Sequence, residues 1–398
     1  MTEVKHKLLL DLVIMRLFEP VSKLQSIELL STYFGIKHSR QSFYKSASKW
    51  FNLKDLVEDT VVDFLKKCYQ FNFELLFYDV TTLYFETFKA DELRIPGFSK
   101  DNKSLQAQIV VALMVTPDGF PVGYEVFSGN TFEGNTIIPV VESFIKKRDI
   151  QKFTIVADAA MISNANIESF LAHGINYIVG ARLGNITQDL FEQIQDNLKK
   201  EDGQTTRIRT DKGDLICSYS KVRYNKDKYE MEKQIKRAEF LKENPSKNKK
   251  VKFLKLENKK PVINTKLIER TTALLGVKGY YTNLSEKEAD NATIIARYHD
   301  LYKIEQAFRI AKSDLQTRPI FHYKEEPIKL HLLICFMALV TAKHIELRTE
   351  VSIKKFLTEL KKITDARLYS HLTKKEMKMT VKTNPRIEEL IDKLKLPH

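Results

Sequence analysis

The run from Leu75 to Val80 constrains the fold more than any other part of this sequence. Its residues, Leu-Leu-Phe-Tyr-Asp-Val, favour β-structure and are apolar on both faces, which is typical of a strand at the centre of a sheet. An aspartate inside such a strand is costly unless it is hydrogen-bonded, ion-paired or metal-bound. The run therefore predicts a central strand with a functional Asp79, and a buried structural aspartate is the alternative.

The segments that follow predict a mixed sheet with helices on its faces. Gln106–Val115 and Phe120–Phe127 are strand-like, and the Thr-Pro-Asp-Gly sequence between them is a strong hairpin signal. A helix, a strand, a helix capped by Ser163 and a last strand are then expected, in that order, at 135–147, 153–157, 163–173 and 177–180. The order β-β-β-α-β-α-β is typical of an α/β fold with a mixed sheet.

The remaining sequence divides around this core. Residues 1–72 are helical by pattern, with a helix at Leu53–Tyr69 and another that we expect Ser26 to cap and Gly35 to end. We expect four parts: a helical N-terminal segment at 1–72, a mixed-sheet core at 73–181 and 285–348, a β-rich, Lys-rich basic insertion at 182–284, and a basic helical tail at 349–398.

The charge of the chain favours polyanionic partners. Its formal net charge is +14 and its pI about 9.3, and basic residues that neutralise phosphates release condensed counterions. The segment Lys221–Lys260 holds 15 Lys and Arg residues against 6 Asp and Glu residues. Such runs are often solvated helix faces or mobile loops, but the position of this one inside the insertion favours a surface that faces DNA.

Two further carboxylates accompany Asp79. Asp158 follows an apolar strand, at the carboxyl end where α/β sheets place their sites. Glu305 lies in a helical pattern that runs from about Ser285 to Asp314. Oxygen ligands of this kind suit two Mg²⁺ ions in phosphodiester chemistry, in which one ion activates the attacking group and the other stabilises the leaving oxygen.

The helical pattern around Glu305 predicts one functional face. Tyr298, Glu305 and Lys312 are spaced by seven residues, which is close to two helical turns, and Tyr302 and Arg309 join them. The cations suit phosphate oxygens and the phenols suit stacking or phosphate hydrogen bonds. A solvent-exposed stripe of helical salt bridges is the alternative.

Cysteines and hydropathy indicate a cytoplasmic protein. Cys68, Cys217 and Cys335 are scattered, which argues against a disulfide scaffold or a thiolate zinc site. We expect no signal peptide, and the apolar segment Leu330–Ala342 predicts a buried helix that is too short to span a bilayer.

With these motifs in place, the chain resembles the DDE transposases of bacterial insertion sequences, of the IS-four type and its sixteen-thirty-four-like branch. The resemblance covers about residues 75–345. It is carried by Tyr78–Glu86, Gly97–Asp101, Gly119–Phe127, Gly129–Thr131, Val156–Asp158, Ile178–Arg182, Ile304–Arg309 and Arg318–Ile320 with His322.

The resemblance implies a ribonuclease-H-like catalytic core in which Asp79, Asp158 and Glu305 are the catalytic, metal-binding residues. It implies two Mg²⁺ ions, with Mn²⁺ as a substitute, and no nucleotide cofactor. The partners it implies are double-stranded DNA, as terminal inverted repeats and target, and a second copy of the chain in a homodimer on DNA. It places the protein in the bacterial cytoplasm, on the nucleoid when it acts, with no membrane partner.

The sequence departs from the family pattern at four places, of which the mildest is Ala160, where relatives commonly have glycine after the second aspartate. Leu301 stands at the family's arginine position, so that phosphate contact beside Tyr298 and Lys312 is expected either to be missing or to have moved to Arg309. The family's insertion-domain tryptophan has no counterpart, since Trp50 lies outside that segment, and Tyr280 or Tyr281 is expected to stack on DNA instead. The N-terminal region that relatives carry before the segment resembling residues 8–30 is expected to be truncated.

The expected function is cut-and-paste transposition, with metal-dependent cleavage at the element ends and transfer of the freed 3′-hydroxyl into target DNA. Two alternatives stay open. One is an N-terminally truncated remnant that binds DNA without catalysis, and the other is a metal-dependent nuclease of the same fold.

Overall fold

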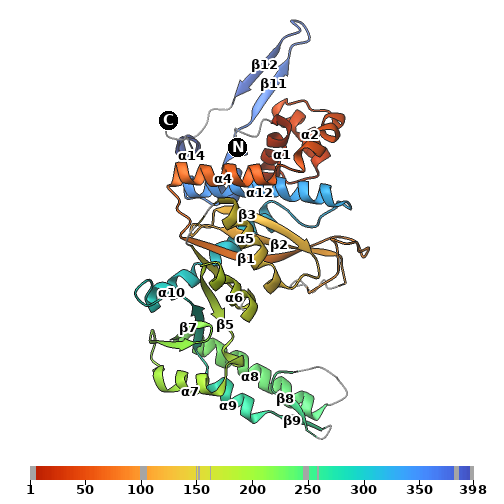
Figure 1. The fold of residues 1–398 in the computed structure, drawn as a ribbon. Coiled ribbons are helices and arrows are strands. Elements are labelled where there is room, and N and C mark those ends of the chain that lie inside the picture. The colour runs from red at the N-terminus through yellow and green to blue at the C-terminus, as the bar shows by residue number, and fades with distance from the viewer. Residues whose placement is uncertain are drawn as a thin grey trace. The chain divides into compact units, whose positions relative to one another are not determined.

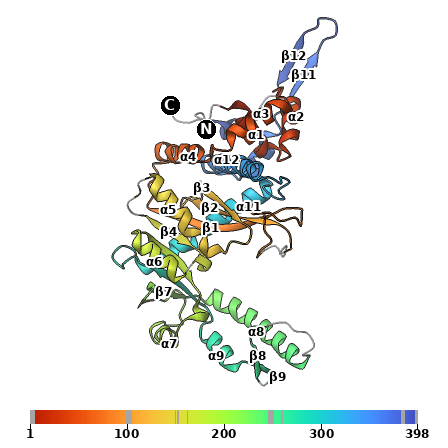
Figure 2. The same ribbon diagram turned by 45° about the vertical axis from the view of Figure 1, so that its right-hand side comes forward.

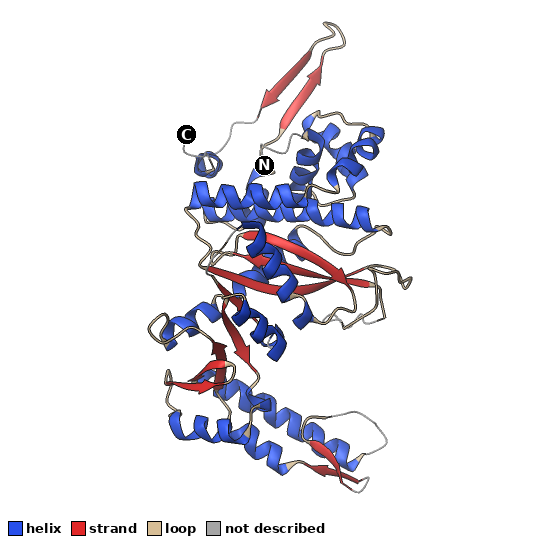
Figure 3. Cartoon of the chain, viewed as in Figure 1, coloured by secondary structure: helices blue, strands red, loops and turns tan. Residues whose placement is uncertain are grey.

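The computed structural model describes residues 6–98, 105–148, 150, 153–161, 163–244, 251–257, 260–380 and 385–394. The chain forms two compact units. Unit 1 comprises residues 1–149 and 302–398, and unit 2 comprises residues 150–301. Both units contain helices and strands (Figure 3), and each unit is described separately below.

The sheet of unit 1 is antiparallel, in the order β3-β2-β1. Its strands are β1 (Leu75–Tyr84), β2 (Gln108–Val115) and β3 (Pro121–Ser128). The turn between β2 and β3 contains Gly119 at φ 78°, a left-handed conformation that favours glycine. All of β2 is buried, so this sheet is the core of the unit, and the predicted hairpin is confirmed.

Helices cover both faces of this sheet (Figure 1). The unit contains α1 (Lys7–Phe18), α2 (Lys23–Phe34), α3 (Arg40–Trp50), α4 (Lys54–Tyr69), α5 (Ile137–Arg148), α11 (Tyr302–Arg309), α12 (Glu325–Thr349), α13 (Ile353–Leu360) and α14 (Pro385–Lys393). Figure 2 shows α11 beside β1 and β2, against which it packs. On the other side, the hydroxyl of Tyr78 in β1 donates a hydrogen bond to Thr136, which directly precedes α5.

The N-terminal segment is helical, as the pattern indicates, but its details differ. The expected cap, Ser26, is buried inside α2, and Ser22 accepts the capping hydrogen bond from the amide of Gln25. Gly35 ends the helix with φ 68°, as expected. The helix α3 was missed because its sequence is polar on most positions, with Phe43, Ala47 and Trp50 as the only buried residues.

The helix α12 is the centre of unit 1. It extends beyond the predicted apolar segment to 25 residues and, among the described residues, is the one helix long and apolar enough to cross a membrane. Of its most apolar stretch of 18 residues, 78% is buried inside the fold. The prediction of a buried helix is therefore confirmed, but the expectation that it is too short to span a bilayer is wrong for its length. The helix packs against α1, α3, α4 and β3.

The C-terminal tail is basic but not wholly helical. Between α13 and α14 it forms a hairpin of β11 (Asp365–Tyr369) and β12 (Glu376–Thr380). Leu368 pairs with Met377, and Ala366 with Met379, so the apolar residues of both strands share one face. That alternation is a period-two signal, which the expectation of a helix overlooked.

Unit 2 begins with a parallel pair of strands. β4 (Thr154–Ala157) and β5 (Asn176–Ala181) are joined through α6 (Asn164–Ala172), whose N-cap is Ser163 as predicted. With the three strands and α5 of unit 1 before them, they complete the order β-β-β-α-β-α-β along the chain. The mixed α/β class with a ribonuclease-H-like order is therefore confirmed.

The insertion continues the strands of unit 2, in the order β4-β5-β10-β7-β6. It contains α7 (Gln188–Asn197), β6 (Thr205–Thr210), β7 (Gly213–Tyr219), α8 (Lys221–Glu243), β8 (Leu254–Glu257), β9 (Lys260–Ile263), α9 (Thr265–Ala273) and β10 (Val277–Thr282). The first half of the Lys-rich segment is the long helix α8, and part of the second half lies outside the described residues. Strands and helices thus share the insertion.

The expected single helix from Ser285 to Asp314 is wrong. The chain forms α10 (Asn291–His299), then a turn at Asp300 and Leu301, then α11, which continues as a π-helical turn, η4 (Ile310–Asp314). The amide of Leu301 bonds to the carbonyl of Tyr298, three residues back, and the amide of Leu315 bonds to that of Ile310, five residues back. Both depart from the α-helical ladder, so the seven-residue spacing does not follow one continuous α-helix.

Candidate catalytic carboxylates

Asp79 lies in the middle of β1 and is half-buried. Its Oδ1 accepts a hydrogen bond of 2.8 Å from the amide of Val80. Because side chains alternate along a strand, Asp79 shares a face with Thr81 and Leu83 and is opposite in direction to Tyr78. The face of β1 that carries Asp79 is therefore not the face toward Thr136.

Residues of α11 and η4 cover the face of the sheet from which Asp79 projects. Thr81 and Leu83 line a small cavity of about 50 Å³ together with Phe308, Lys312 and residues of α12. Leu113, which pairs with Asp79 across the strands, lines the same cavity. Lys312 thus lies on the side of the sheet from which Asp79 projects.

Glu305 stands in the first turn of α11 and is exposed. The buried residues of the helix are Ile304, Ala307 and Phe308, so the packing of the apolar face leaves the Glu305 carboxylate in solvent. Arg309, four residues later, is exposed as well. Unit 1 therefore presents a carboxylate and a guanidinium on the solvent side of α11.

Asp158 comes directly after β4 and is exposed, whereas all four residues of the strand are buried. Its Oδ1 accepts two hydrogen bonds, one of 2.7 Å from the amide of Ala159 and one of 3.2 Å from the hydroxyl of Tyr298. Both hydrogen bonds use the same carboxylate oxygen. The structure thus brings together two of the residues that the sequence predicts for the site.

Three of the tyrosines expected to contact DNA are buried, whereas the fourth, Tyr302 of α11, is 48% exposed. Tyr298 is 8% exposed and Tyr281 is also 8% exposed, while Tyr280 is fully buried. Burial raises the pKa of both Tyr280 and Tyr281 above the ordinary range of a phenol. These rings present no free face in unit 2, which counts against the expected stacking on a base.

Sequence reasoning missed two residues that surround Tyr298. A Cβ added to Gly180 would lie 2.5 Å from the Tyr298 hydroxyl oxygen. The ammonium of Lys278 lies 4.5 Å from the centre of the Tyr298 ring, within range of a cation–π contact. A glycine inside a strand is a signal of close approach by another group, and Gly180 in β5 carried that signal.

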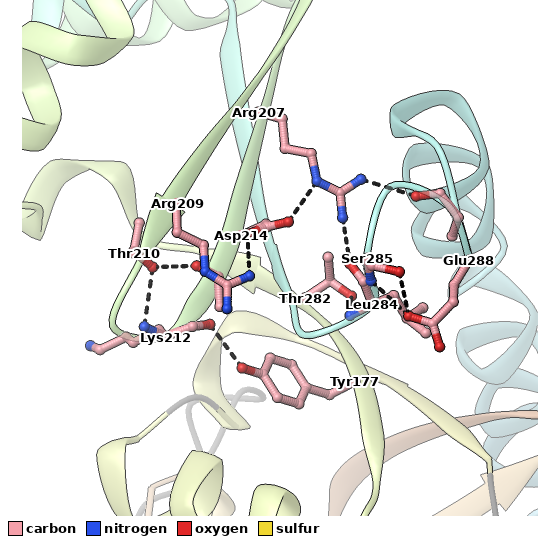
Figure 4. Close-up of polar contacts among 12 residues, drawn as sticks. Tyr177, Arg207, Arg209, Thr210, Lys212, Asp214, Thr282, Leu284, Ser285 and Glu288 are labelled. Carbon is pink, nitrogen blue, oxygen red and sulfur yellow. Dashed lines mark hydrogen bonds and ion pairs between the residues drawn. The ribbon is translucent and has the colours of Figure 1, made fainter.

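Arg207 of β6 holds the connection that leads into α10 (Figure 4). Its guanidinium donates hydrogen bonds to Asp214 and to the backbone carbonyls of Leu284 and Ala289. The Arg207–Asp214 pair is mostly buried, with side chains 11% and 12% exposed. One side chain of the insertion therefore fixes the start of the helix that carries Tyr298.

The donor set suits a hard divalent cation. Carboxylate oxygens are the ligands that Mg²⁺ prefers, and Asp158 and Glu305 are exposed to receive it. Among the described residues, no group of three or more His, Cys, Asp or Glu side chains lies close enough to hold a metal ion by itself. Asp79 and Glu305 belong to unit 1 and Asp158 to unit 2.

The comparison with protein families decides the assignment. The model of the transposase DDE domain matches residues 72–341, which include all three carboxylates and more than half of the chain. The chain belongs to the transposase DDE-domain family. Its role therefore lies in DNA transposition, by a class of domain that generally depends on divalent metal ions.

The chain also resembles one solved transposase structure at low sequence identity. A solved structure of a piggyBac transposase synaptic complex with hairpin DNA, determined by cryo-EM, is 10% identical, with a TM-score of 0.46. The similarity covers 98% of this chain and 70% of that chain. No curated protein shows significant similarity to the sequence.

Proposed function

We propose that the protein is a metal-dependent transposase that cleaves DNA at the ends of its element and joins the freed 3′-hydroxyl to target DNA. The observation that carries this proposal is the match to the transposase DDE domain over residues 72–341. Within that range the proposed catalytic residues are Asp79, Asp158 and Glu305. The proposal extends to an insertion sequence of the IS-four type and its sixteen-thirty-four-like branch.

The local positions of the three carboxylates support this assignment. Asp158 lies at the carboxyl end of a buried strand, Asp79 interrupts an otherwise apolar strand, and Glu305 projects from a helix that packs on that strand. Two bound Mg²⁺ ions, or Mn²⁺ ions, would polarise the scissile phosphate and activate the attacking hydroxyl. The protein supplies the oxygen ligands, and no covalent enzyme intermediate or nucleotide is required.

Cations near the carboxylates are proposed to hold the DNA backbone. Arg309 is exposed four residues after Glu305, and Lys312 lines the cavity on the Asp79 face of β1. Guanidinium and ammonium groups suit phosphate oxygens. In unit 2, α8 carries eight Lys and Arg residues against five Asp and Glu residues and is largely exposed, which suits a non-specific contact with DNA.

The proposed partners are double-stranded DNA, as the terminal inverted repeats and the target, and a second copy of the chain in a dimer on DNA. The net charge of +14 supports a polyanionic partner. The proposed location is the bacterial cytoplasm, at the nucleoid during transposition.

Single substitutions of the carboxylates test the proposed function. Asp79→Asn, Asp158→Asn and Glu305→Gln should each reduce cleavage by at least 10³-fold, since each removes a charged ligand at a reaction centre. The substrate is linear DNA that carries the gene with its genomic flanks, incubated with Mg²⁺ or Mn²⁺. The matched control is Asp196→Asn, an exposed aspartate of α7, which should leave cleavage unchanged.

DNA binding and product analysis complete the test. The three variants should bind the same DNA within about threefold of wild type in gel-shift assays with Ca²⁺. Joined target products indicate transposition, whereas cleavage without joining indicates a nuclease of the same fold. Metal-dependent cleavage that survives any one of the three substitutions would refute the assignment of that residue.

A further inference from the structure

We propose that Tyr298 is a positioning residue that holds the Asp158 carboxylate in its metal-binding orientation, rather than a residue that contacts DNA phosphate. This inference rests on the proposed role of Asp158 in metal binding. It starts from the hydrogen bond of 3.2 Å that the Tyr298 hydroxyl donates to Asp158 Oδ1. The two residues are 140 positions apart in the sequence, and both lie in unit 2.

The surroundings of the Tyr298 ring fix it in place. The ring packs edge-on against Tyr280 of β10, with the ring centres 4.9 Å apart and the planes at 61°. The Lys278 ammonium lies over the ring, and α10 packs against β4, β5 and β10. A ring that is 8% exposed and held on two sides has little freedom to swing its hydroxyl toward a DNA backbone.

Gly180 provides the space through which the hydroxyl reaches Asp158. A Cβ at this position would come within 2.5 Å of the hydroxyl oxygen and 3.2 Å of the Ala159 Cβ. The φ of Gly180 does not lie in the left-handed region, so its backbone conformation is open to any residue. The requirement for glycine here is therefore one of space for the tyrosine.

The two hydrogen bonds to Asp158 define what the tyrosine contributes. The amide of Ala159 and the Tyr298 hydroxyl both donate to Oδ1, and they prevent rotation of an otherwise exposed side chain. Because both contacts fix Oδ1, they also fix the direction of the other carboxylate oxygen, Oδ2. Oδ2 is therefore the atom that would bind a cation. Groups that orient a metal ligand in this way commonly change metal affinity 10- to 100-fold when removed.

A metal titration without DNA separates positioning from phosphate contact. Binding of Mn²⁺ to the full chain is measured by electron paramagnetic resonance or calorimetry for wild type, Asp158→Asn and Tyr298→Phe. We expect Asp158→Asn to weaken Mn²⁺ binding strongly and Tyr298→Phe to weaken it about tenfold. DNA affinity in Ca²⁺ should stay within about twofold of wild type for Tyr298→Phe, because the hydroxyl does not contact phosphate.

Tyr177→Phe is the matched control. Tyr177 is a buried tyrosine of β5 in the same unit, and its hydroxyl donates to the carbonyl of Lys212 (Figure 4). Its loss should lower stability to the extent of one buried hydrogen bond and leave Mn²⁺ affinity unchanged. A similar loss of Mn²⁺ affinity in Tyr177→Phe and Tyr298→Phe would show a general effect of destabilisation and would overturn the inference.

Gly180→Ala supplies a second, independent route to the same hydroxyl. The added Cβ should displace it from Asp158 and weaken Mn²⁺ binding about as much as Tyr298→Phe does. The double variant should lose little more than either single one, because both remove the same contact. Additive losses would contradict a shared mechanism.

The remaining outcomes separate this inference from the proposed function. If Asp158→Asn weakens Mn²⁺ binding but Tyr298→Phe does not, the positioning role is refuted and the metal role of Asp158 stands. If Tyr298→Phe weakens DNA binding instead, the tyrosine is a phosphate contact. If neither variant changes Mn²⁺ binding, the assignment of Asp158 as a metal ligand fails together with the inference.

Discussion

The stability of unit 1 should depend on pH through a buried lysine. Lys23, at the start of α2, is 7% exposed, and its Nζ lies 2.7 Å from His322 Nε2 and 3.2 Å from His331 Nδ1. Burial, with the positive charge of Arg16 adding to it, lowers the pKa of Lys23 from 10.5 to about 7. Cys335 acts weakly in the opposite direction.

The sign follows from the proton balance. Because the pKa of Lys23 is lower in the folded protein, the unfolded chain holds more protons on this group between about pH 7 and pH 10.5. Stability therefore rises with pH through that window and is lost as pH falls toward 7. The histidines act in the same direction at lower pH, since burial and Lys23 lower the pKa of His322 to about 4 and that of His331 well below its ordinary value.

The magnitude is set by the protons taken up between two pH values. When the pH falls from 8.5 to 6, the lowered pKa of Lys23 alone should reduce the free energy of unfolding by about 2 kcal/mol. Lys23→Met removes the amine and keeps an unbranched side chain. The variant should lose about 2 kcal/mol less than wild type over this range.

Urea unfolding followed by Trp50 fluorescence measures this difference. Trp50 is the only tryptophan of the chain, is 1% exposed, and lies in α3 of unit 1. The control is Lys329→Met, which replaces an exposed lysine of α12 and should keep the wild-type pH dependence. Equal pH dependence in wild type and Lys23→Met would refute the argument that Lys23 is held neutral in the fold.

Two further predictions concern the framework of the site. Arg207→Ala should destabilise unit 2 by about 2 kcal/mol, because it leaves Asp214 Oδ2 and the carbonyls of Leu284 and Ala289 without their donor, whereas Arg209 still pairs with Asp214 Oδ1. Near-ultraviolet circular dichroism of the tyrosines during thermal unfolding measures this loss, and a change below about 1 kcal/mol would contradict the clamp. Gly129→Ala should destabilise unit 1 severely, because a Cβ there would lie 2.0 Å from the Ile95 carbonyl oxygen, whereas Gly184→Ala, with nothing within 4 Å, should be nearly neutral. Comparable unfolding midpoints for these two glycine variants would exclude the steric explanation.

The central strand, the hairpin turn and one helix cap were predictable because their signals are local. The apolar run of β1, the Gly119 turn and the Ser163 cap each depend on a few adjacent residues, and the structure confirms them. The hairpin of β11 and β12 was also encoded locally, by apolar residues at alternate positions of both strands. It was missed because the basic composition of the tail suggested solvated helix.

The surroundings of the carboxylates were less predictable because they depend on distant contacts. Nothing near Asp158 in the sequence indicates that Tyr298 donates to it, and nothing near Arg207 indicates that it binds carbonyls of Leu284 and Ala289. The burial of Tyr280 and Tyr281 follows from β10 lying between β5 and β7. A pattern of exposed aromatics and a pattern of buried ones look alike until the sheet order is known.

The break between α10 and α11 gives the seven-residue spacing a different meaning. In an unbroken helix, Tyr298 and Glu305 would face the same way and share one task. In the structure a turn at Asp300 and Leu301 ends the first helix, so Tyr298 belongs to unit 2 and Glu305 to unit 1. The seven residues therefore span two short helices with separate roles. Tyr298 of α10 orients Asp158, and α11 presents the Glu305 carboxylate to solvent. A substitution that straightens this connection should impair both roles at once, whereas Tyr298→Phe should impair the first alone.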